Sequence, residues 1–398
     1  MGCPGDIVHI ANWNMPQGVG RHTNGGNYDD GLYDPVNFRG GAENLKAMIR
    51  QIHDDGSLVS LYTIATYLPR ASKLGREIGE KVCQIGGNGK PVADATCFFP
   101  CLDAWQDCYI AALLKAQREL NADVIYLDCY PFGKWSNACY SKEHGHEVPL
   151  NLNRAQHRLL AKLRAKLPSH VAIWGEDPCM DYDCDLMSGN ITYYYTTIHE
   201  HRARSYDIDD AANRDFYRPL QNIQRYTMPQ IKQFGFPCGW VPSGPVVNEV
   251  NALFFNGEGT YDCGFMLFDS HYRARLRHWL QIQRALPDCF TSSAPKPLAA
   301  TAAGEIYANE FSGNNQTAWT LWNGRFSTYR GPVLRVPHVE GAHYYDAWNA
   351  TPVTLERDGA DDILSVAEMA PQGLGCIVQY FGPLPEGLPK ESVMESVK

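Results

Sequence analysis

Short apolar runs alternate with longer amphipathic stretches up to about residue 292, and this alternation restricts the fold more than any other feature. The runs are rich in Val, Ile, Tyr and Phe, and the stretches between them carry apolar residues at helical spacing. Parallel strands joined by crossover helices produce this pattern. The predicted strands are 7–12, 58–63, 124–128, 171–176, 191–196, 236–241 and 252–256. The predicted helices are 41–55, 104–120, 153–167, 216–234 and 271–286.

Several predicted strands end in polar groups, in the sequences NWN, LDCY, GEDP and NGEG. A (β/α)8 barrel assembles its active site from the C-terminal ends of its strands. We therefore predict an α/β fold with a (β/α)8 TIM barrel over residues 1–292. Seven strands are predicted, and a closed barrel needs eight. Either one short strand is not detected from its hydrophobic periodicity, or the first strand is missing from the chain. In the second case 124–128 is the fourth strand and 171–176 the fifth.

The pattern changes after the connector TSSAPKPLAAT to short alternating segments separated by Gly, Asn and Pro. Turns about every ten residues, with period-two alternation between them, predict an antiparallel β-sandwich over 293–381. Residues 382–398 are rich in Pro and Glu, which predicts a disordered tail. This tail and the abrupt start of the first strand suggest a portion of a longer protein.

The charge balance argues against two kinds of partner. The chain has 35 basic and 44 acidic residues, a formal net charge of −9, and no cluster of Lys and Arg. Nucleic acids and anionic membrane surfaces are both bound through such clusters, so we predict neither as a partner. The start of the chain lacks the basic and apolar regions of a signal peptide, and the compartment and oligomeric state are left open.

The cysteine and histidine residues of the chain could in principle bind a metal ion. The chain has 13 cysteines, but their odd number and irregular spacing do not fit a disulfide scaffold, so we expect mostly free thiols with one or two bridges. Two His-X-His pairs, His144 with His146 and His199 with His201, have the spacing found in barrel metallohydrolases. Because no CxxC occurs and both pairs lie in polar, loop-like segments, we predict neither a metal nor a cofactor.

Two carboxylates end neighbouring predicted strands. Asp128 ends the strand in DVIYLDCYPFG and Glu176 ends the strand in VAIWGEDPC. Capping of the next loop is the alternative role for Asp128. Consecutive strand residues point to opposite sides, so Glu176 is preferred over Asp177 for facing the cavity. Such a pair is the minimum for glycoside hydrolysis, because one carboxyl protonates the leaving oxygen while the other attacks the anomeric carbon or activates water.

The candidate substrate-binding residues are mostly aromatic side chains at or just past strand ends. Aromatic residues make up 12% of the chain, and the flat faces of Trp and Tyr suit both sugar rings and protein cores. Stacking on a sugar and packing at the rim therefore both stay open. Glu258 follows a late strand as a third carboxylate, with sugar binding, catalysis or loop solvation as its possible roles. The full set is Trp13, Tyr130, Trp135, Trp174, Asp177, Tyr195, His199, Trp240 and Glu258.

The segments VIYLDCY, IWGEDP, KAMIRQIHDDGSLVSLYT, AWTLWNGR and YYDAWN together resemble barrel glycoside hydrolases of the α-galactosidase-like group, above all the endo-α-N-acetylgalactosaminidase type. In that type an Asp ending the fourth strand is the nucleophile and a Glu ending the fifth is the acid/base. The resemblance therefore implies these roles for Asp128 and Glu176. True α-galactosidases take their acid from an Asp on the sixth strand, and YYYTTIHEH has no Asp at its end.

The sequence thus predicts a retaining glycoside hydrolase that acts on an oligo- or polysaccharide. One alternative is a metal-dependent hydrolase on a TIM barrel that uses His199 and His201. The other is a non-catalytic carbohydrate-binding barrel. The sequence does not predict the sugar, the linkage, or endo against exo action.

Overall fold

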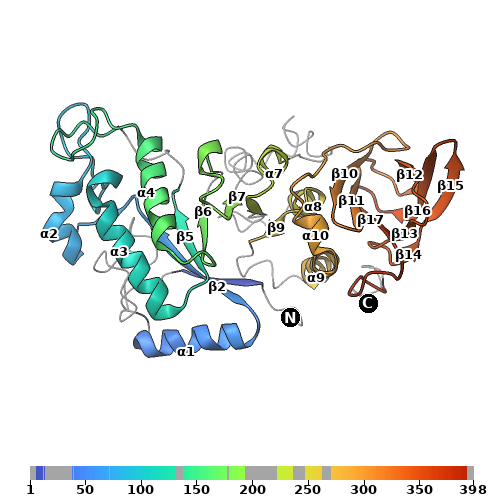
Figure 1. The fold of residues 1–398 in the computed structure, drawn as a ribbon, viewed down its shortest axis with the longest axis horizontal. Helices are drawn as coiled ribbons and strands as arrows, with labels where there is room; N and C mark the ends of the chain where they lie inside the picture. Colours follow the sequence, from blue (N-terminus) through green and yellow to red (C-terminus); the bar gives the residue numbers. More distant parts are fainter. Residues whose placement is uncertain are drawn as a thin grey trace. The chain divides into compact units, whose positions relative to one another are not determined.

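The chain forms two compact units, Met1–Ile191 and Thr192–Lys398, which are described separately. The computed structural model (Figure 1) describes residues 6–11, 13, 38, 40–70, 72–130, 138–176, 179–192, 222–235, 247–261 and 270–391. The domain boundary predicted after residue 292 lies inside the second unit. Among the described residues, no helix is both long and apolar enough to cross a membrane.

The first unit is built on parallel strands that pair in chain order. They are β1 (Ile7–Ile10), β2 (Leu58–Ile64), β5 (Val124–Asp128), β6 (Ala172–Gly175) and β7 (Gly189–Thr192). The intervening helices are α1 (Gly41–Asp54), α3 (Leu102–Leu120) and α4 (Leu152–Lys166), with the 3-10 turn η2 (Asp181–Asp183) before β7. Between β2 and α3 the chain adds β3 (Leu68–Pro69), α2 (Lys73–Val82) and β4 (Cys97–Phe98).

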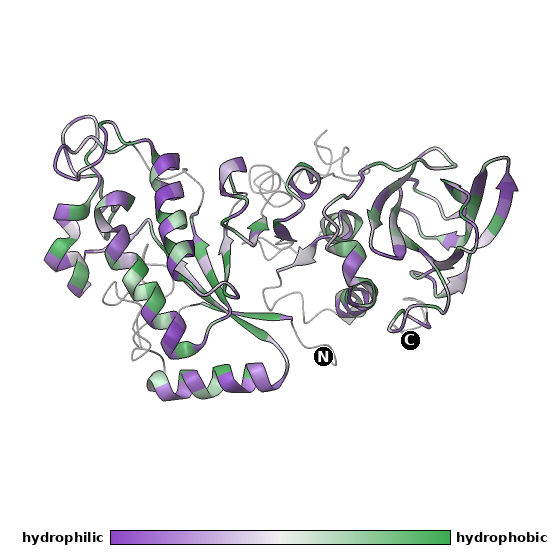
Figure 2. Ribbon diagram, viewed as in Figure 1, coloured by the Kyte–Doolittle hydropathy of each residue, from purple (hydrophilic) through white to green (hydrophobic). Residues whose placement is uncertain are grey.

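The two faces of this sheet differ because strand side chains alternate. One face packs under helices, and Thr63 on it hydrogen-bonds Tyr109 of α3 with 2.9 Å between the oxygens. Its fully buried members are Val59, Leu61, Ile125, Leu127 and Ile173. Figure 2 shows β2 and β5 as mostly hydrophobic and α3 and α4 as mixed. The other face carries the polar and aromatic residues described below.

The second unit begins with α7 (Ile223–Thr227), α8 (Val247–Phe255), α9 (Ser270–Ala285) and α10 (Pro287–Phe290), and with the parallel pair β8 (Lys232–Gly235) and β9 (Gly259–Thr260). Two antiparallel sheets follow. One has the order β10 (Ile306–Ser312), β11 (Gln316–Asn323), β17 (Leu374–Tyr380), β13 (His343–Asp346), β14 (Thr351–Pro352). The other has the order β12 (Tyr329–Pro337), β16 (Asp361–Met369), β15 (Thr354–Asp358).

Residues 387–389 pack within the second unit, so the disorder predicted from residue 382 is wrong for these three residues. Leu388 is 3% exposed and belongs to the hydrophobic core formed by α8, α9, β11 and β17. Tyr345 donates a hydrogen bond to the carbonyl of Pro389 over 2.9 Å. These contacts outweigh the Pro-rich composition on which the prediction rested.

Two predicted elements are wrong in type. Residues 252–256, predicted as a strand, lie at the end of helix α8, because a short apolar run buried on all sides has no periodicity that separates helix from strand. The predicted helix 216–234 contains only the short α7 and then strand β8 within the described residues. The predicted strand 236–241 lies outside the described residues. The helices predicted at 41–55, 104–120, 153–167 and 271–286 are confirmed within a few residues.

Candidate active site

Asp128 and Glu176 lie side by side because neighbouring parallel strands end at the same level. Leu127 of β5 pairs with Gly175 of β6, and one further step along each chain brings the two carboxyl groups together. The Glu176 N–H donates to the carbonyls of Leu127 (3.1 Å) and Tyr130 (2.9 Å), which holds the strand end in place. One oxygen of each carboxyl and the Cys129 sulfur all lie within 4.8 Å of one another.

Two tyrosine hydroxyls anchor Asp128. Tyr62 Oη donates to Asp128 Oδ2 over 2.5 Å, and Tyr126 Oη donates to Oδ1 over 3.3 Å. The tyrosines pair in register on β2 and β5, with ring centroids 5.6 Å apart. Burial and the nearby Asp128 raise the pKa of Tyr62 well above its usual value, so its hydroxyl stays a donor at neutral pH.

Cys129 turns the chain between the two carboxyls. Its φ of 53° lies in the left-handed region, which is rare for a residue with a side chain and marks a constrained site. In this conformation its N–H donates to Glu176 Oε2 over 2.7 Å. Burial and the two neighbouring carboxyls raise the pKa of the Cys129 thiol, so the thiol stays protonated.

The surroundings of Asp128 determine its ionisation. Burial and the adjacent Glu176 raise the pKa of Asp128 well above its usual value, while the hydrogen bond from Tyr62 acts in the opposite direction. Burial and the neighbouring carboxyl thus disfavour the charged form of Asp128, and the Tyr62 hydroxyl favours it.

An aromatic layer lies one step below the carboxyls on the same face of the sheet. Trp174 pairs with Tyr126 in register, two residues before Glu176. His9 hydrogen-bonds Ser60 with 2.9 Å between Nδ1 and Oγ, and its ring lies 4.8 Å from that of Tyr126. Burial lowers the pKa of His9 to about 4, so its imidazole is neutral at neutral pH.

Four of the predicted substrate-binding residues are buried, and one of them is Trp174, which is 6% exposed. Trp13 is fully buried and donates its indole N–H to the Tyr62 carbonyl over 2.9 Å. Tyr130 is fully buried and donates to the Gln156 carbonyl of α4. Glu258 is 1% exposed immediately before β9, so its placement on a flexible, solvated loop is wrong. For Trp13 and Tyr130 the geometry supports packing over stacking on a sugar.

The remaining predicted residues of the site, which are Trp135, Asp177, Tyr195, His199 and Trp240, lie outside the described residues. In the other direction, sequence reasoning missed four contributors to the site, which are His9, Tyr62, Tyr126 and Cys129. A signal for Tyr126 was present, since it precedes Asp128 by two residues and so shares its face. No local sequence signal marks Tyr62, whose role depends on the pairing of β2 with β5.

Among the described residues of the first unit, two groups of side chains are close enough to hold a metal ion. The first is Asp128, Cys129 and Glu176. The second is separate and combines two cysteines with two histidines, Cys101, Cys139, His144 and His146. The Cys129 thiol and the tyrosine hydrogen bonds to Asp128 make the first a group of mixed character, whereas the second contains only ligand types that zinc prefers.

Comparison with known proteins gives matches among solved structures alone. No protein-family model and no curated protein matches the chain. A noncanonic maltogenic alpha-amylase from Thermotoga neapolitana matches with a TM-score of 0.63 and 12% identity over 96% of this chain and 91% of its own. The Nostoc punctiforme debranching enzyme matches with a TM-score of 0.61 and 12% identity over 94% and 85%. An alpha-amylase from Geobacillus thermoleovorans, solved with acarbose, matches with a TM-score of 0.59 and 10% identity over 96% and 89%.

At this level of identity the likeness shows the fold. The chain has the architecture of these enzymes, a TIM barrel followed by an antiparallel β domain, which confirms the predicted fold class. The named structures are amylase-type enzymes, so they support the fold of a barrel glycoside hydrolase in general. The narrower resemblance to the α-galactosidase-like group stays a prediction.

Proposed function

We propose that this chain is a retaining glycoside hydrolase that acts on an oligo- or polysaccharide, with Asp128 as nucleophile and Glu176 as acid/base. The observation that carries the proposal is the carboxyl pair at the ends of adjacent parallel strands, with oxygens within 4.8 Å. Carboxyl groups of retaining enzymes stand about 5–5.5 Å apart, and those of inverting enzymes about 6.5–9.5 Å apart to admit a water molecule. The 4.8 Å is an upper limit for one oxygen of each carboxyl, and it lies closer to the separation found in retaining enzymes, which supports retention.

The hydrogen bonds to Asp128 support its role as the nucleophile. Asp128 is the last residue of its strand, and the hydroxyls of Tyr62 and Tyr126 stabilise its carboxylate and fix its direction. A fixed, charged oxygen is what attack on an anomeric carbon requires. In the proposed mechanism Glu176, which lies beside it, is the carboxyl that holds the proton when substrate is bound.

The reaction then takes two steps. Glu176 gives its proton to the glycosidic oxygen while an Asp128 oxygen bonds to the anomeric carbon, so the leaving sugar departs and a glycosyl ester forms. The Glu176 carboxylate next takes a proton from water, whose oxygen attacks the anomeric carbon and releases Asp128 as a carboxylate. Two displacements at one carbon return the original anomeric configuration.

The substrate class follows from the fold and from the sequence resemblance together. The matching structures are described as amylases and a debranching enzyme, one of them bound to acarbose. The resemblance stated above adds galactose-type sugars. We therefore propose an α-linked carbohydrate as the substrate, with aryl α-glycosides of glucose, galactose and N-acetylgalactosamine as the first compounds to test.

A hydrolysis screen with matched variants tests the proposal. Wild-type protein should release the aryl group from at least one glycoside, and NMR should show a first-formed product with the anomeric configuration of the substrate. Asp128→Ala should abolish turnover. Asp107→Asn, which changes an exposed acid on α3 of the same unit, should leave turnover unchanged. Full activity in Asp128→Ala would remove the assignment.

The same screen separates the two alternatives. A metal-dependent hydrolase would lose activity on removal of its ion, whereas the proposed mechanism passes no step through a metal. A non-catalytic carbohydrate-binding barrel would bind glycans in calorimetry and release no product. Glycan binding by a protein that never yields product, at any pH between 4 and 8, would favour this second alternative.

A further inference from the structure

A group of two cysteines and two histidines lies outside the carboxyl site, in the connections that follow β2 and β5. The Sγ atoms of Cys101 and Cys139 and one ring nitrogen each of His144 and His146 all lie within 4.8 Å of one another. We propose that these four side chains bind one zinc ion in a structural Cys2His2 site. The proposal does not depend on the glycoside hydrolase function.

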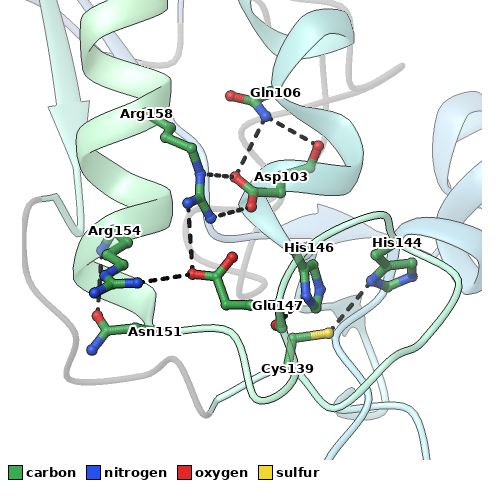
Figure 3. Close-up of polar contacts among 9 residues, drawn as sticks. All are labelled: Asp103, Gln106, Cys139, His144, His146, Glu147, Asn151, Arg154 and Arg158. Carbon is green, nitrogen blue, oxygen red and sulfur yellow. Dashed lines mark hydrogen bonds and ion pairs between the residues drawn. The ribbon is translucent and has the colours of Figure 1, made fainter.

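The distances suit a tetrahedral ion. Zinc bonds of about 2.3 Å to sulfur and about 2.0 Å to nitrogen place the ligand atoms of a tetrahedral site about 3.3–3.8 Å apart. Cys139 Sγ lies 3.4 Å from His144 Nδ1, inside that range (Figure 3). The ring centroids of His144 and His146 are 5.6 Å apart, so both imidazoles reach the same point from one loop.

Backbone carbonyls orient both imidazoles for metal binding. His144 Nε2 lies 3.0 Å from the Lys81 carbonyl, and His146 Nδ1 lies 2.8 Å from the Glu147 carbonyl. A carbonyl only accepts, so each of these nitrogens carries the hydrogen and the other nitrogen of each ring presents a lone pair. His146 Nε2 is buried and has no hydrogen-bond partner. Metal-bound histidines typically donate their second nitrogen to such a carbonyl.

Both sulfurs are buried and come from separate segments of the chain. Cys101 is fully buried at the N-cap of α3. Cys139 is 1% exposed and accepts the N–H of Ile85, with 3.4 Å between nitrogen and sulfur. Two thiolates with two neutral imidazoles balance the charge of a divalent zinc ion, so the buried centre would be neutral overall.

Zinc in this position would join segments that are far apart in the sequence. Cys101 ends the connection from β2 to α3, and Cys139 and the histidines belong to the connection from β5 to α4. Arg158 of α4 braces the same region, because it pairs with Asp103 of α3 and with Glu147 next to His146 (Figure 3). A metal crosslink here would hold the loop that continues from Asp128, which assigns the ion a structural role.

Metal analysis of the 398-residue chain tests the site. Protein purified without chelator, or reduced and dialysed against zinc and then against metal-free buffer, should contain about one zinc per chain. Cobalt substitution should give the absorption of a tetrahedral ion with thiolate ligands. Cys139→Ser and His146→Ala should each reduce bound zinc at least tenfold, and Cys108→Ser, which alters a cysteine of α3 outside the cluster, should retain it.

Two results would overturn the proposal. One is folded wild-type protein that keeps less than a tenth of an equivalent of zinc after reduction and dialysis. The other is a Cys101–Cys139 disulfide in the folded protein, detected by mass spectrometry of alkylated peptides. If a variant fails to fold, the wild-type protein can be used instead. Its thiols are modified and the release of zinc is followed with a metal dye, which tests whether the cysteines are ligands. Zinc retained after both thiols are modified would contradict the assigned ligands.

Discussion

Replacing Tyr62 by Phe removes the shorter hydrogen bond to the proposed nucleophile and leaves the ring in place. The bond runs from the Tyr62 hydroxyl to Asp128 Oδ2 over 2.5 Å. A hydrogen bond to a charged group contributes about 1.5–3 kcal/mol, and 1.36 kcal/mol corresponds to one pKa unit. The bond lowers the pKa of Asp128, so its loss raises that pKa further above its usual value.

The assay is the pH dependence of kcat/KM with the aryl glycoside that the wild-type protein hydrolyses best. Asp128 must be ionised to attack, so the acidic limb of the profile should move to higher pH in Tyr62→Phe. Tyr126→Phe should move it less, because that hydroxyl lies 3.3 Å from the carboxylate. Activity on the plateau should fall less than activity at acidic pH.

Tyr109→Phe is the matched control. Tyr109 also loses a buried hydroxyl bond, 2.9 Å from Thr63, but on the helix-covered face of the sheet. This variant should lower thermal stability and leave the acidic limb where it is. An acidic limb that stays in place in Tyr62→Phe, or that moves equally in Tyr109→Phe, would refute the role given to Tyr62.

Three further predictions concern the acid/base, the pH dependence of stability and the packing. Glu176→Ala should lose most activity on glycosides with poor leaving groups, yet still react with a dinitrophenyl glycoside, which needs no proton, and azide should accelerate its turnover; equal losses on both substrates would contradict the acid role. Burial lowers the pKa of His278 from 6.5 to about 4, so unfolding takes up a proton between these values and stability should fall as the pH drops through this window, by at most about 1.4 kcal/mol per unit. Denaturation at several pH values should show a shallower fall in His278→Gln. Gly79→Ala should cost about 1–3 kcal/mol in chemical denaturation, because its new Cβ would lie 2.3 Å from the Phe98 ring, whereas Gly304→Ala, with open space around it, should be close to neutral.

The sequence was sufficient for the elements whose periodicity is strong. Helices α1, α3, α4 and α9 carry apolar residues on one face, and the strands with Tyr62 and Asp128 are continuous apolar runs. Helix α8 was mistaken for a strand because an apolar run packed on every side has no exposed face to set a period. A short apolar run therefore does not by itself distinguish a buried strand from a buried helix.

The candidate site also has residues that the sequence could predict and residues that it could not. Asp128 and Glu176 were predictable because each ends its own strand, and that position alone determines their side of the sheet. The tyrosine donors and the Cys129 N–H were not predictable, since their contacts depend on the register between strands and on one unusual φ angle. The proposed zinc cluster was not predicted from the sequence for a related reason. Cys101 and Cys139 are brought together by folding and lack the short spacing of a local motif.

Trapping of the glycosyl-enzyme tests the central claim, the roles of Asp128 and Glu176, most directly. A 2-fluoro glycoside with a good leaving group, built on the sugar that the screen identifies, slows the second step and lets the covalent ester accumulate. Peptide mass spectrometry of the inactivated protein should place the sugar on Asp128, and Asp128→Asn should take up none. A sugar attached to Glu176 or to any other residue, or turnover with an inverted product, would contradict the account.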